Sequence, residues 1–253
     1  MSDPLHRTFL LVDTERFSDR DDVQQAYLRR MLYDVVDRTL LAAGVDQTLR
    51  LRADRGDAIM ELIDSSVPVN TLLRALLTEV PAQLRSVNRL AASSAQIRLR
   101  AVLATGYVMI DEYDGWVGSD LNHACRLLDG DTLRAALREC HDDYALCVSE
   151  AVYSGIVRHE HPGVPSAEFR EITVPGKNGP LTAWLHGPLP QGAAAAPAAA
   201  TPSAAPSPAS ASSPTSSPAP ESVPTTMEVH FGGTNNGVQA GVVHGGITFG
   251  ERR

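Results

Sequence analysis

The chain has 253 residues and a formal net charge of −8. Because no cluster of Lys and Arg is dense enough to neutralise a run of phosphates, we expect no nucleic-acid partner. The sequence has neither 18 consecutive apolar residues nor a basic N-terminus followed by an apolar stretch, so we expect a cytoplasmic protein without a membrane partner. The three cysteines, Cys125, Cys140 and Cys147, lack metal-ligand spacing and are predicted to be reduced thiols.

The first 190 residues carry the apolar pattern of a folded domain. Residues 8–13 form an apolar run that ends in an acid, which predicts a buried strand with Asp13 at its edge. A helix should follow over residues 22–43, and Gly44 supplies its end. The apolar residues that mark this helix are Tyr27, Met31, Val35 and Leu41.

A β-hairpin is predicted next, with strands at 49–53 and 58–63 and Asp57 at its tip. A second amphipathic helix should cover residues 70–90, with Pro81 as a kink or a break. Residues 96–104 and 107–113 then alternate like two paired strands on either side of a turn at Thr105-Gly106.

The rest of the domain is predicted to contain shorter elements. A helix begins at Ser119 or Asp120, either of which is a good N-cap, and runs to Leu128. Further helices are expected at 132–140 and 150–157, and further strands at 145–148, 168–174 and 181–186. The fold class is therefore α+β, with the order β-α-β-β-α-β of a ferredoxin-like core plus additions.

Residues 191–226 differ sharply in composition from the domain before them. Ala, Pro and Ser dominate, Glu221 is the one charged residue, and aromatic residues are absent. Such a segment cannot bury enough apolar area to offset its ordering entropy. We therefore predict a domain at 1–190, a disordered, semi-extended linker at 191–226, and a separate motif at 227–253.

Two acids are delivered to one edge of the predicted sheet. Asp13 ends the first strand and Asp57 is at the hairpin tip. Carboxylates placed in this way suit a pair of hard divalent cations, with triphosphate oxygens completing the coordination. Each aspartate taken alone is equally typical of a turn, so the interpretation depends on the motifs around them.

Three segments together resemble the class III adenylyl/guanylyl cyclase family. They are Val-Asp-Thr-Glu-Arg-Phe-Ser at 12–18, Arg-Gly-Asp-Ala-Ile-Met at 55–60, and Val-Gly-Ser-Asp-Leu-Asn-His-Ala-Cys-Arg-Leu at 117–127. The resemblance covers roughly residues 7–155, and the third motif is the most specific. It implies a cyclase-type core that binds a nucleoside triphosphate and forms a homodimer, because active sites in this family lie between two subunits.

The resemblance also implies residue roles. Asp13 and Asp57 would bind the catalytic Mg²⁺ or Mn²⁺ ions. Asn122 would orient the ribose, and Arg126 would stabilise charge on the transferring phosphorus. These two residues are four apart on one predicted helix, so they share a face and can reach one ligand.

Nucleotide contacts are predicted at Phe17, Gly56 and Gly118, which lie within the three motifs. Gly118 should allow the backbone to approach the nucleotide closely where strand becomes helix. The main-chain amides that follow Asp13 are expected to hold phosphates.

Two base-reading positions depart from the family pattern. The position four residues before Asp57 is Ala53, and the position three before Gly118 is Gly115. Purine specificity is therefore unsupported. Two interpretations stay open: a cyclase with an unusual base preference, or a nucleotide-binding domain with little turnover.

The C-terminal motif is Gly-rich, β-branched and almost uncharged. One face of its alternating residues can pack dryly while amide side chains stack in ladders, which predicts β-amyloid assembly. The predicted amyloid core consists of Asn236, Gly237, Val238, Gln239, Ala240, Gly241, Val242, Val243 and Gly245. The alternatives are a floppy tail and a docking strand that adds to a sheet edge.

This motif resembles the RIP homotypic interaction motif and, more broadly, bacterial amyloid signalling motifs. The resemblance implies self-assembly and a matching motif on an NLR-type partner. We therefore expect a bacterial signalling or defence effector in which amyloid templating clusters cyclase-like domains and alters their activity. The alternatives are a catalytically inactive cyclase-homology adaptor and a plain cyclase with an incidental tail.

Overall fold

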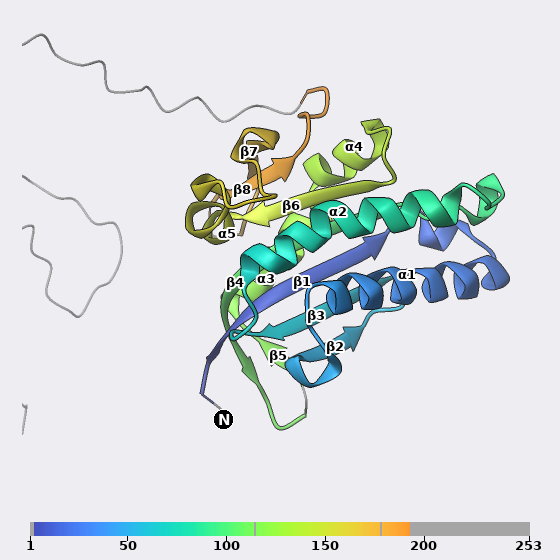
Figure 1. The fold of residues 1–253 in the computed structure, drawn as a ribbon. Coiled ribbons are helices and arrows are strands. Elements are labelled where there is room, and N and C mark those ends of the chain that lie inside the picture. Colours follow the sequence, from blue (N-terminus) through green and yellow to red (C-terminus); the bar gives the residue numbers. More distant parts are fainter. Residues whose placement is uncertain (1–2, 114, 178, 193–253) are drawn as a thin grey trace, which may run out of the picture. The chain divides into compact units, whose positions relative to one another are not determined.

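The computed structural model describes residues 3–113, 115–177 and 179–192, which form one mixed sheet with helices on both faces (Figure 1). The strands are β1 (Leu5–Thr14), β2 (Arg50–Asp54), β3 (Ala58–Asp64), β4 (Leu99–Ile110), β5 (Trp116–Val117), β6 (Tyr144–Ser149), β7 (Phe169–Val174) and β8 (Leu181–His186). The α-helices are α1 (Asp22–Ala42), α2 (Val69–Asn88), α3 (Ser119–Asp129), α4 (Asp131–Glu139) and α5 (Glu150–Gly155). The 3-10 helices are Phe17–Asp19, Gln47–Leu49, Ser93–Ala95, Val157–His159 and Ser166–Glu168.

The strand order in the sheet is β2-β3-β1-β4-β6-β8-β7, and β5 pairs with the end of β4. Strand β1 is antiparallel to both β3 and β4, whereas β4 and β6 are parallel. The elements β1-α1-β2-β3-α2-β4 follow the predicted ferredoxin-like order, and their strands lie in the sequence β2-β3-β1-β4 that this motif requires. The predicted fold class is confirmed.

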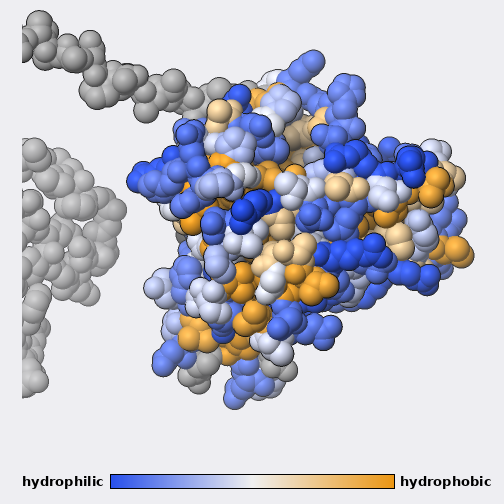
Figure 2. Space-filling view, in the orientation of Figure 1, coloured by the Kyte–Doolittle hydropathy of each residue, from blue (hydrophilic) through white to orange (hydrophobic). Residues whose placement is uncertain are grey.

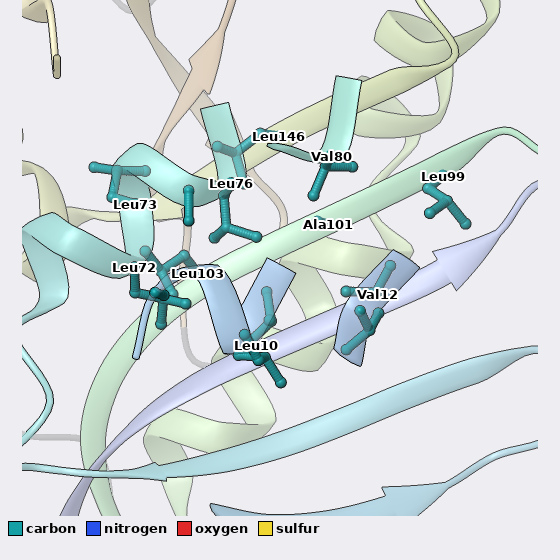
Figure 3. Close-up of a cluster of buried hydrophobic side chains, with 14 of the residues drawn as sticks. Leu10, Val12, Leu72, Leu73, Leu76, Val80, Leu99, Ala101, Leu103 and Leu146 are labelled. Atoms are coloured by element: carbon teal, nitrogen blue, oxygen red, sulfur yellow. The ribbon is translucent and has the colours of Figure 1, made fainter. Parts of the chain in front are cut away.

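Strand β1 is central because its side chains are apolar on both faces. Leu10 and Val12 point into a core beneath α1 and α2, and Phe9 and Leu11 point into a second core beneath α3 and α4. Figure 3 shows Leu10 and Val12 packed with side chains of α2 and of β4. Each fully buried side chain of this size stabilises the fold by about 1.5–3 kcal/mol. A strand covered on both faces therefore holds Asp13, its second-to-last residue, firmly in place.

The apolar face of α1 is wider than the prediction and excludes one of its four residues. Val35 is buried, and Tyr27 and Met31 pack against the core, as predicted, whereas Leu41 is 71% exposed. The other residues that this helix buries are Leu28, Leu32, Val36 and Leu40. The side that carries α1 and α2 has hydrophilic residues interspersed with smaller hydrophobic patches (Figure 2).

The predicted turn at Thr105-Gly106 is wrong, because β4 runs without interruption from Leu99 to Ile110. The glycine has a different purpose there. A Cβ atom at Gly106 would lie 2.3 Å from the Cβ of Asp120, so a side chain at this position would collide with α3. Gly106 therefore allows α3 to pack closely on the strand.

Helix α3 begins at Ser119, as predicted, but its N-cap is Gly118 rather than Ser119 or Asp120. The carboxylate of Asp120 instead accepts a hydrogen bond from the backbone N–H of Tyr107, at 2.8 Å. Pro81 was predicted to kink or to break the second helix. Helix α2 is continuous through Pro81, so the break does not occur.

Of the helices in the described ranges, none has the length and hydropathy needed to cross a bilayer. The described residues end at 192. Most of the predicted linker (193–226) and the whole predicted amyloid core (236–243 and Gly245) therefore lie outside them. The division of the chain at 190 and 226 stays a prediction.

Candidate active site

The sheet edge at the end of β1 opens into a cavity of about 270 Å³, which we call the Asp13 cavity. Its charged lining consists of Asp13, Arg55, Asp57, Arg100, Asp129 and Arg134. Leu11, Met60 and Leu128 form its apolar wall. The structure thus brings together the two aspartates that the sequence predicted as metal ligands.

Asp13 is the more buried of the two acids, with 8% of its side chain exposed. It is paired with Arg100 across β1 and β4, where the two residues are register partners, and their side chains form an ion pair. Its Oδ1 atom is buried and has no hydrogen-bond partner among the described residues. Burial raises the pKa of Asp13 above its ordinary value against the opposing effect of Arg100, and the nearby charge of Asp57 raises it further.

Asp57 is exposed at the tip of the β2–β3 hairpin. Its backbone carbonyl accepts a hydrogen bond from the N–H of Thr14, at 3.0 Å, which fixes the tip beside the end of β1. The turn depends on Gly56, whose φ of 88° lies in the left-handed region that favours glycine. Gly56 therefore shapes the turn that presents Asp57.

The hairpin is anchored to α1 at two places. At its tip, Arg29 of α1 forms an ion pair with Asp54. Along its length, Arg50 and Arg52 of β2 contact two acids: Asp37 of α1, at 2.8 and 2.6 Å, and the fully buried Glu61 of β3, at 2.7 and 2.5 Å. Burial raises the pKa of Glu61 against the lowering effect of the two arginines. Arg52 is thus committed to this network.

Two arginines of the Asp13 cavity were missed by the sequence analysis. Arg100 reaches the cavity because it alternates with buried residues of β4, and Arg134 reaches it from α4. The sequence signal was the alternation of Arg98 and Arg100 around Leu99. Their relation to Asp13 becomes visible only once β1 and β4 are paired.

Asn122 and Arg126 are not part of the Asp13 cavity as the described residues define it. They lie on α3, whose residues Cys125, Leu128 and Asp129 face the cavity instead. Asn122 is exposed and Arg126 is half-buried, and the side chain of neither makes a hydrogen bond or ion pair within the described part of the chain. Within one protomer, therefore, Asn122 and Arg126 do not line the cavity that Asp13 and Asp57 line.

The other two predicted nucleotide contacts, Phe17 and Gly118, have structural roles as Gly56 does. Phe17, in a 3-10 helix after β1, packs against the core beneath α1 and α2. Gly118 is where α3 meets β4: a Cβ there would lie 2.6 Å from the carbonyl oxygen of Tyr107. Among the amides that follow Asp13, those of Thr14 and Glu15 donate to backbone carbonyls of Asp57 and Arg98. These two amides are not free to hold phosphates, which corrects the prediction.

The two base-reading positions have structural partners as well. Ala53 packs against the core beneath α3 and α4. The backbone N–H of Gly115 donates to the carboxylate of Asp111, at 2.7 Å, in the turn between β4 and β5. Neither position supplies a side chain that could discriminate a purine.

The donors of the Asp13 cavity fit a divalent cation only in part. Carboxylate oxygens are the ligands that Mg²⁺ and Mn²⁺ prefer, and Asp13 has an unpartnered buried oxygen for one. No group of three or more His, Cys, Asp or Glu residues suited to a metal occurs within the described ranges. Two carboxylates leave the remaining positions to water and phosphate oxygens, which is the usual arrangement for Mg²⁺ at a nucleotide site.

Two exposed apolar residues share one face of the sheet near the β4–β5 turn. Tyr107 is 60% exposed and Val117 51%. Val117 pairs with Met109, two residues along β4 from Tyr107, so both side chains lie on the same face. Leu5, which is 48% exposed, pairs with Val108 and therefore lies on the opposite face. Tyr107 and Val117 are surface that a second protein chain could bury.

Several solved structures are similar to this chain. The guanylyl cyclase Cya2 has a TM-score of 0.52 and 15% identity, with 77% of this chain and 98% of that one covered. A bacterial light-regulated adenylyl cyclase has a TM-score of 0.51 and 14% identity, with coverage of 75% and 94%. An adenylate/guanylate cyclase/hydrolase from Silicibacter pomeroyi has a TM-score of 0.49 and 19% identity, with coverage of 74% and 99%.

No protein-family model and no curated protein matches the sequence. The two of these structures with TM-scores above 0.5 are a guanylyl cyclase and an adenylyl cyclase. The described domain therefore has the fold of these cyclase domains.

Proposed function

We propose that this chain is a signalling effector with a nucleotide cyclase domain that converts a nucleoside triphosphate to a cyclic nucleotide. The observation that carries the proposal is the Asp13 cavity. The carboxylates of Asp13, at the end of β1, and of Asp57, at the β2–β3 hairpin tip, both line it beside three arginines, and Asp13 has an unpartnered buried oxygen. That combination suits a metal-bound polyphosphate.

Asp13 and Asp57 would hold Mg²⁺ or Mn²⁺ at this site. Bound there, the cations would supply charge stabilisation at the reacting phosphorus and favour ionisation of the attacking ribose hydroxyl. The arginines Arg55, Arg100 and Arg134 line the same cavity and can donate charge-assisted hydrogen bonds to phosphate oxygens. Cyclisation forms a bond from the ribose oxygen to the α-phosphorus, releases pyrophosphate, and frees the hydroxyl proton.

The separation of Asn122 and Arg126 from the Asp13 cavity supports a homodimer. In a two-fold dimer, α3 of one protomer can bring this pair to the cavity of its partner. The exposed Tyr107 and Val117, which share one face of the sheet, offer apolar surface for such an interface. Two composite sites per dimer would result.

The C-terminal motif would control this activity. Amyloid templating through residues 230–250 would cluster the domains and raise the effective concentration at which protomers pair. A matching motif on an NLR-type partner would seed the assembly. Support for this part comes from the composition and the resemblance of residues 227–253.

A second candidate is a catalytically inactive adaptor that acts through nucleotide binding or assembly alone. The ion pair between Arg100 and Asp13 favours it, because the arginine already occupies one oxygen of the carboxylate that would have to bind the metal. The structural roles of Ala53 and Gly115 favour it as well, since neither position reads a base.

The deciding experiment incubates the full chain with each nucleoside triphosphate and Mg²⁺ or Mn²⁺, with and without fibril seeds of residues 227–253, and identifies products by mass. A cyclic product that disappears in Asp57→Asn and Arg126→Ala supports the cyclase. A product rate raised by seeds, and not raised in a chain lacking residues 227–253, supports amyloid control. If no cyclic product forms under any condition, the cyclase is rejected and the inactive adaptor becomes the favoured function.

A further inference from the structure

A cavity of about 310 Å³ lies where strand β6 ends, and we call it the β6-end pocket. Its polar lining consists of Thr105, Asp120, His123, Ser149, Glu150 and Thr182. As far as the described residues show, it shares no residue with the Asp13 cavity, and neither Asn122 nor Arg126 lines it. The β6-end pocket is therefore separate from the candidate active site.

The β6-end pocket is a gap in the sheet. Strand β6 lies between β4 and β8 and ends at Ser149, where the chain turns into α5 (Figure 1). Pairing with β6 stops at Leu103 on β4 and at Ala183 on β8, and residues 104–105 and 181–182 continue past it on either side. Within the described ranges, 104–105 pair only with β1 and 181–182 only with β7. Because neighbouring strands lie about 4.8 Å apart, the two edges leave room for one extended chain between them.

An acid borders this gap on each face of the sheet. Asp120 is on α3, which packs through Ala124 and Leu127 on the core beneath α3 and α4. Glu150 begins α5, which packs through Val152 on the core beneath α1 and α2. The two carboxylates therefore approach the gap from opposite faces.

Each of these carboxylates has one oxygen engaged within the domain. Oδ2 of Asp120 accepts from the backbone N–H of Tyr107, at 2.8 Å, and Oε2 of Glu150 accepts from the indole N–H of Trp184, at 2.6 Å. The second oxygen of each makes no hydrogen bond with any residue that the structure describes. These contacts orient both side chains and leave one acceptor on each for a ligand.

The charge of the lining indicates what kind of ligand fits. Two carboxylates line the β6-end pocket, and the described lining contains no Lys or Arg. The rest of the wall is largely apolar, with Ala104, Ala151 and Leu181 among its residues. A Lys or Arg side chain matches this combination, because its stem is apolar and its end is positively charged.

We propose that the β6-end pocket binds a short extended segment of a partner protein that has two consecutive basic residues. Such a segment continues the line of β6 and forms main-chain hydrogen bonds with the edges of β4 and β8. Consecutive side chains of an extended chain point to opposite faces, so one basic residue reaches Asp120 and the next reaches Glu150. The binding involves neither nucleotide nor metal, and the proposal thus stands apart from the proposed function.

The test measures binding to the full chain in EDTA by fluorescence anisotropy, with labelled acetyl-Thr-Val-Arg-Arg-Val-Thr-amide as the probe. The control peptide acetyl-Thr-Arg-Val-Arg-Val-Thr-amide has the same composition and charge, but both of its arginines point to one face of an extended chain. It should bind about fivefold more weakly, the loss expected for one exposed ion pair. Methylation of both arginine amide nitrogens in the probe should also weaken binding at least about fivefold, because it removes two main-chain donors.

A substitution on the protein locates the binding. Glu150→Gln should weaken binding of the probe about fivefold, because the amide keeps an acceptor for Trp184 but carries no charge. The matched control is Glu112→Gln, which removes the same charge from an exposed residue outside the described lining and should bind like the unaltered chain.

The proposal is overturned if the probe does not bind, if the two arginine peptides bind equally, or if methylation has no effect. Equal binding by Glu150→Gln and Glu112→Gln would also overturn it, because the probe would then bind elsewhere. Asp57→Asn should bind the probe like the unaltered chain, which separates this test from that of the cyclase.

Discussion

Asp13 and Arg100 are direct partners across β1 and β4 and form an ion pair in which 8% and 13% of their side chains are exposed. The pair lies where the central strand ends and the Asp13 cavity begins. The guanidinium compensates the buried carboxylate in this structure. Under the proposed function a divalent cation would compete with Arg100 for the same carboxylate.

Removing the guanidinium of Arg100 should show how far the stability of the fold depends on its ion pair with Asp13. We expect Arg100→Gln to lower the free energy of unfolding by about 3–5 kcal/mol, because it leaves a buried carboxylate without its counter-charge. Urea denaturation measures the loss, with Arg30→Gln as the control that should change stability by less than about 0.5 kcal/mol. A loss as small as that of the control would mean that Asp13 is stabilised by other groups.

Asp57 should matter for nucleotide chemistry and little for stability. It is exposed, so Asp57→Asn should change the free energy of unfolding by less than about 0.5 kcal/mol. The rate of cyclic nucleotide formation in Mg²⁺ should fall at least about a hundredfold, as expected when a metal ligand is lost. The exposed Asp3→Asn is a matched control and should retain full activity. Equal rates in the two variants would remove Asp57 from the site.

Mixing two inactive variants tests whether the site is composite. Asp57→Asn and Arg126→Ala should each be inactive alone, because every dimer site then lacks one of the two residues. In an equal mixture about half of the dimers are mixed, and each has one intact site, so activity should recover to about a quarter of the original. Product formation after co-refolding measures this. No recovery would mean that Asp57 and Arg126 act within one protomer.

The thiol of Cys125 offers a measurement that does not depend on turnover. It lines the Asp13 cavity, whereas Cys147 is fully buried and burial raises the pKa of its thiol to about 12. Nucleoside triphosphate with Mg²⁺ should slow alkylation of Cys125 at least about fivefold, and Cys147 should stay unlabelled throughout. Mass spectrometry of the labelled peptides reports both. Asp57→Asn is the control, since protection of Cys125 that persists in this variant would contradict nucleotide binding through the metal.

The junction of β4 and α3 should not tolerate a side chain at Gly118. Gly118→Ala places a Cβ 2.6 Å from a backbone oxygen, so we expect a loss of about 1–3 kcal/mol in unfolding free energy. Gly155→Ala is the matched control, because its Cβ would meet open space at the end of α5 and should gain up to about 1 kcal/mol. Similar stabilities for the two variants would show that α3 can shift to make room.

Local pattern was enough to predict most of the fold. The apolar run before Asp13 and the turn before Asp57 are set by neighbouring residues, so the first strand and the hairpin were found. The role of Gly106 could not be found in this way, because it depends on Asp120 from another element. The same holds for Arg100, whose relation to Asp13 is fixed by strand pairing.

The candidate site was predicted in two halves that the structure keeps apart. Both aspartates were placed correctly in one cavity, whereas Asn122 and Arg126 were expected at the same ligand. Helical spacing correctly placed the second pair on one face of α3 but carried no information on where that face points. Only the packing of α3 through Leu121, Ala124 and Leu128 determines this.

The attachment of the β2–β3 hairpin to α1 has a mechanical consequence. Asp13 is fixed in the centre of the sheet, but Asp57 sits on a hairpin that is joined to α1 through Arg29, Arg50 and Arg52. The same hairpin is also paired with β1 through β3, and its tip accepts a hydrogen bond from Thr14. Asp57 is therefore held beside Asp13 from two sides, by the sheet and by the helix that covers it. Loss of the three arginine contacts would leave the tip attached to β1 alone.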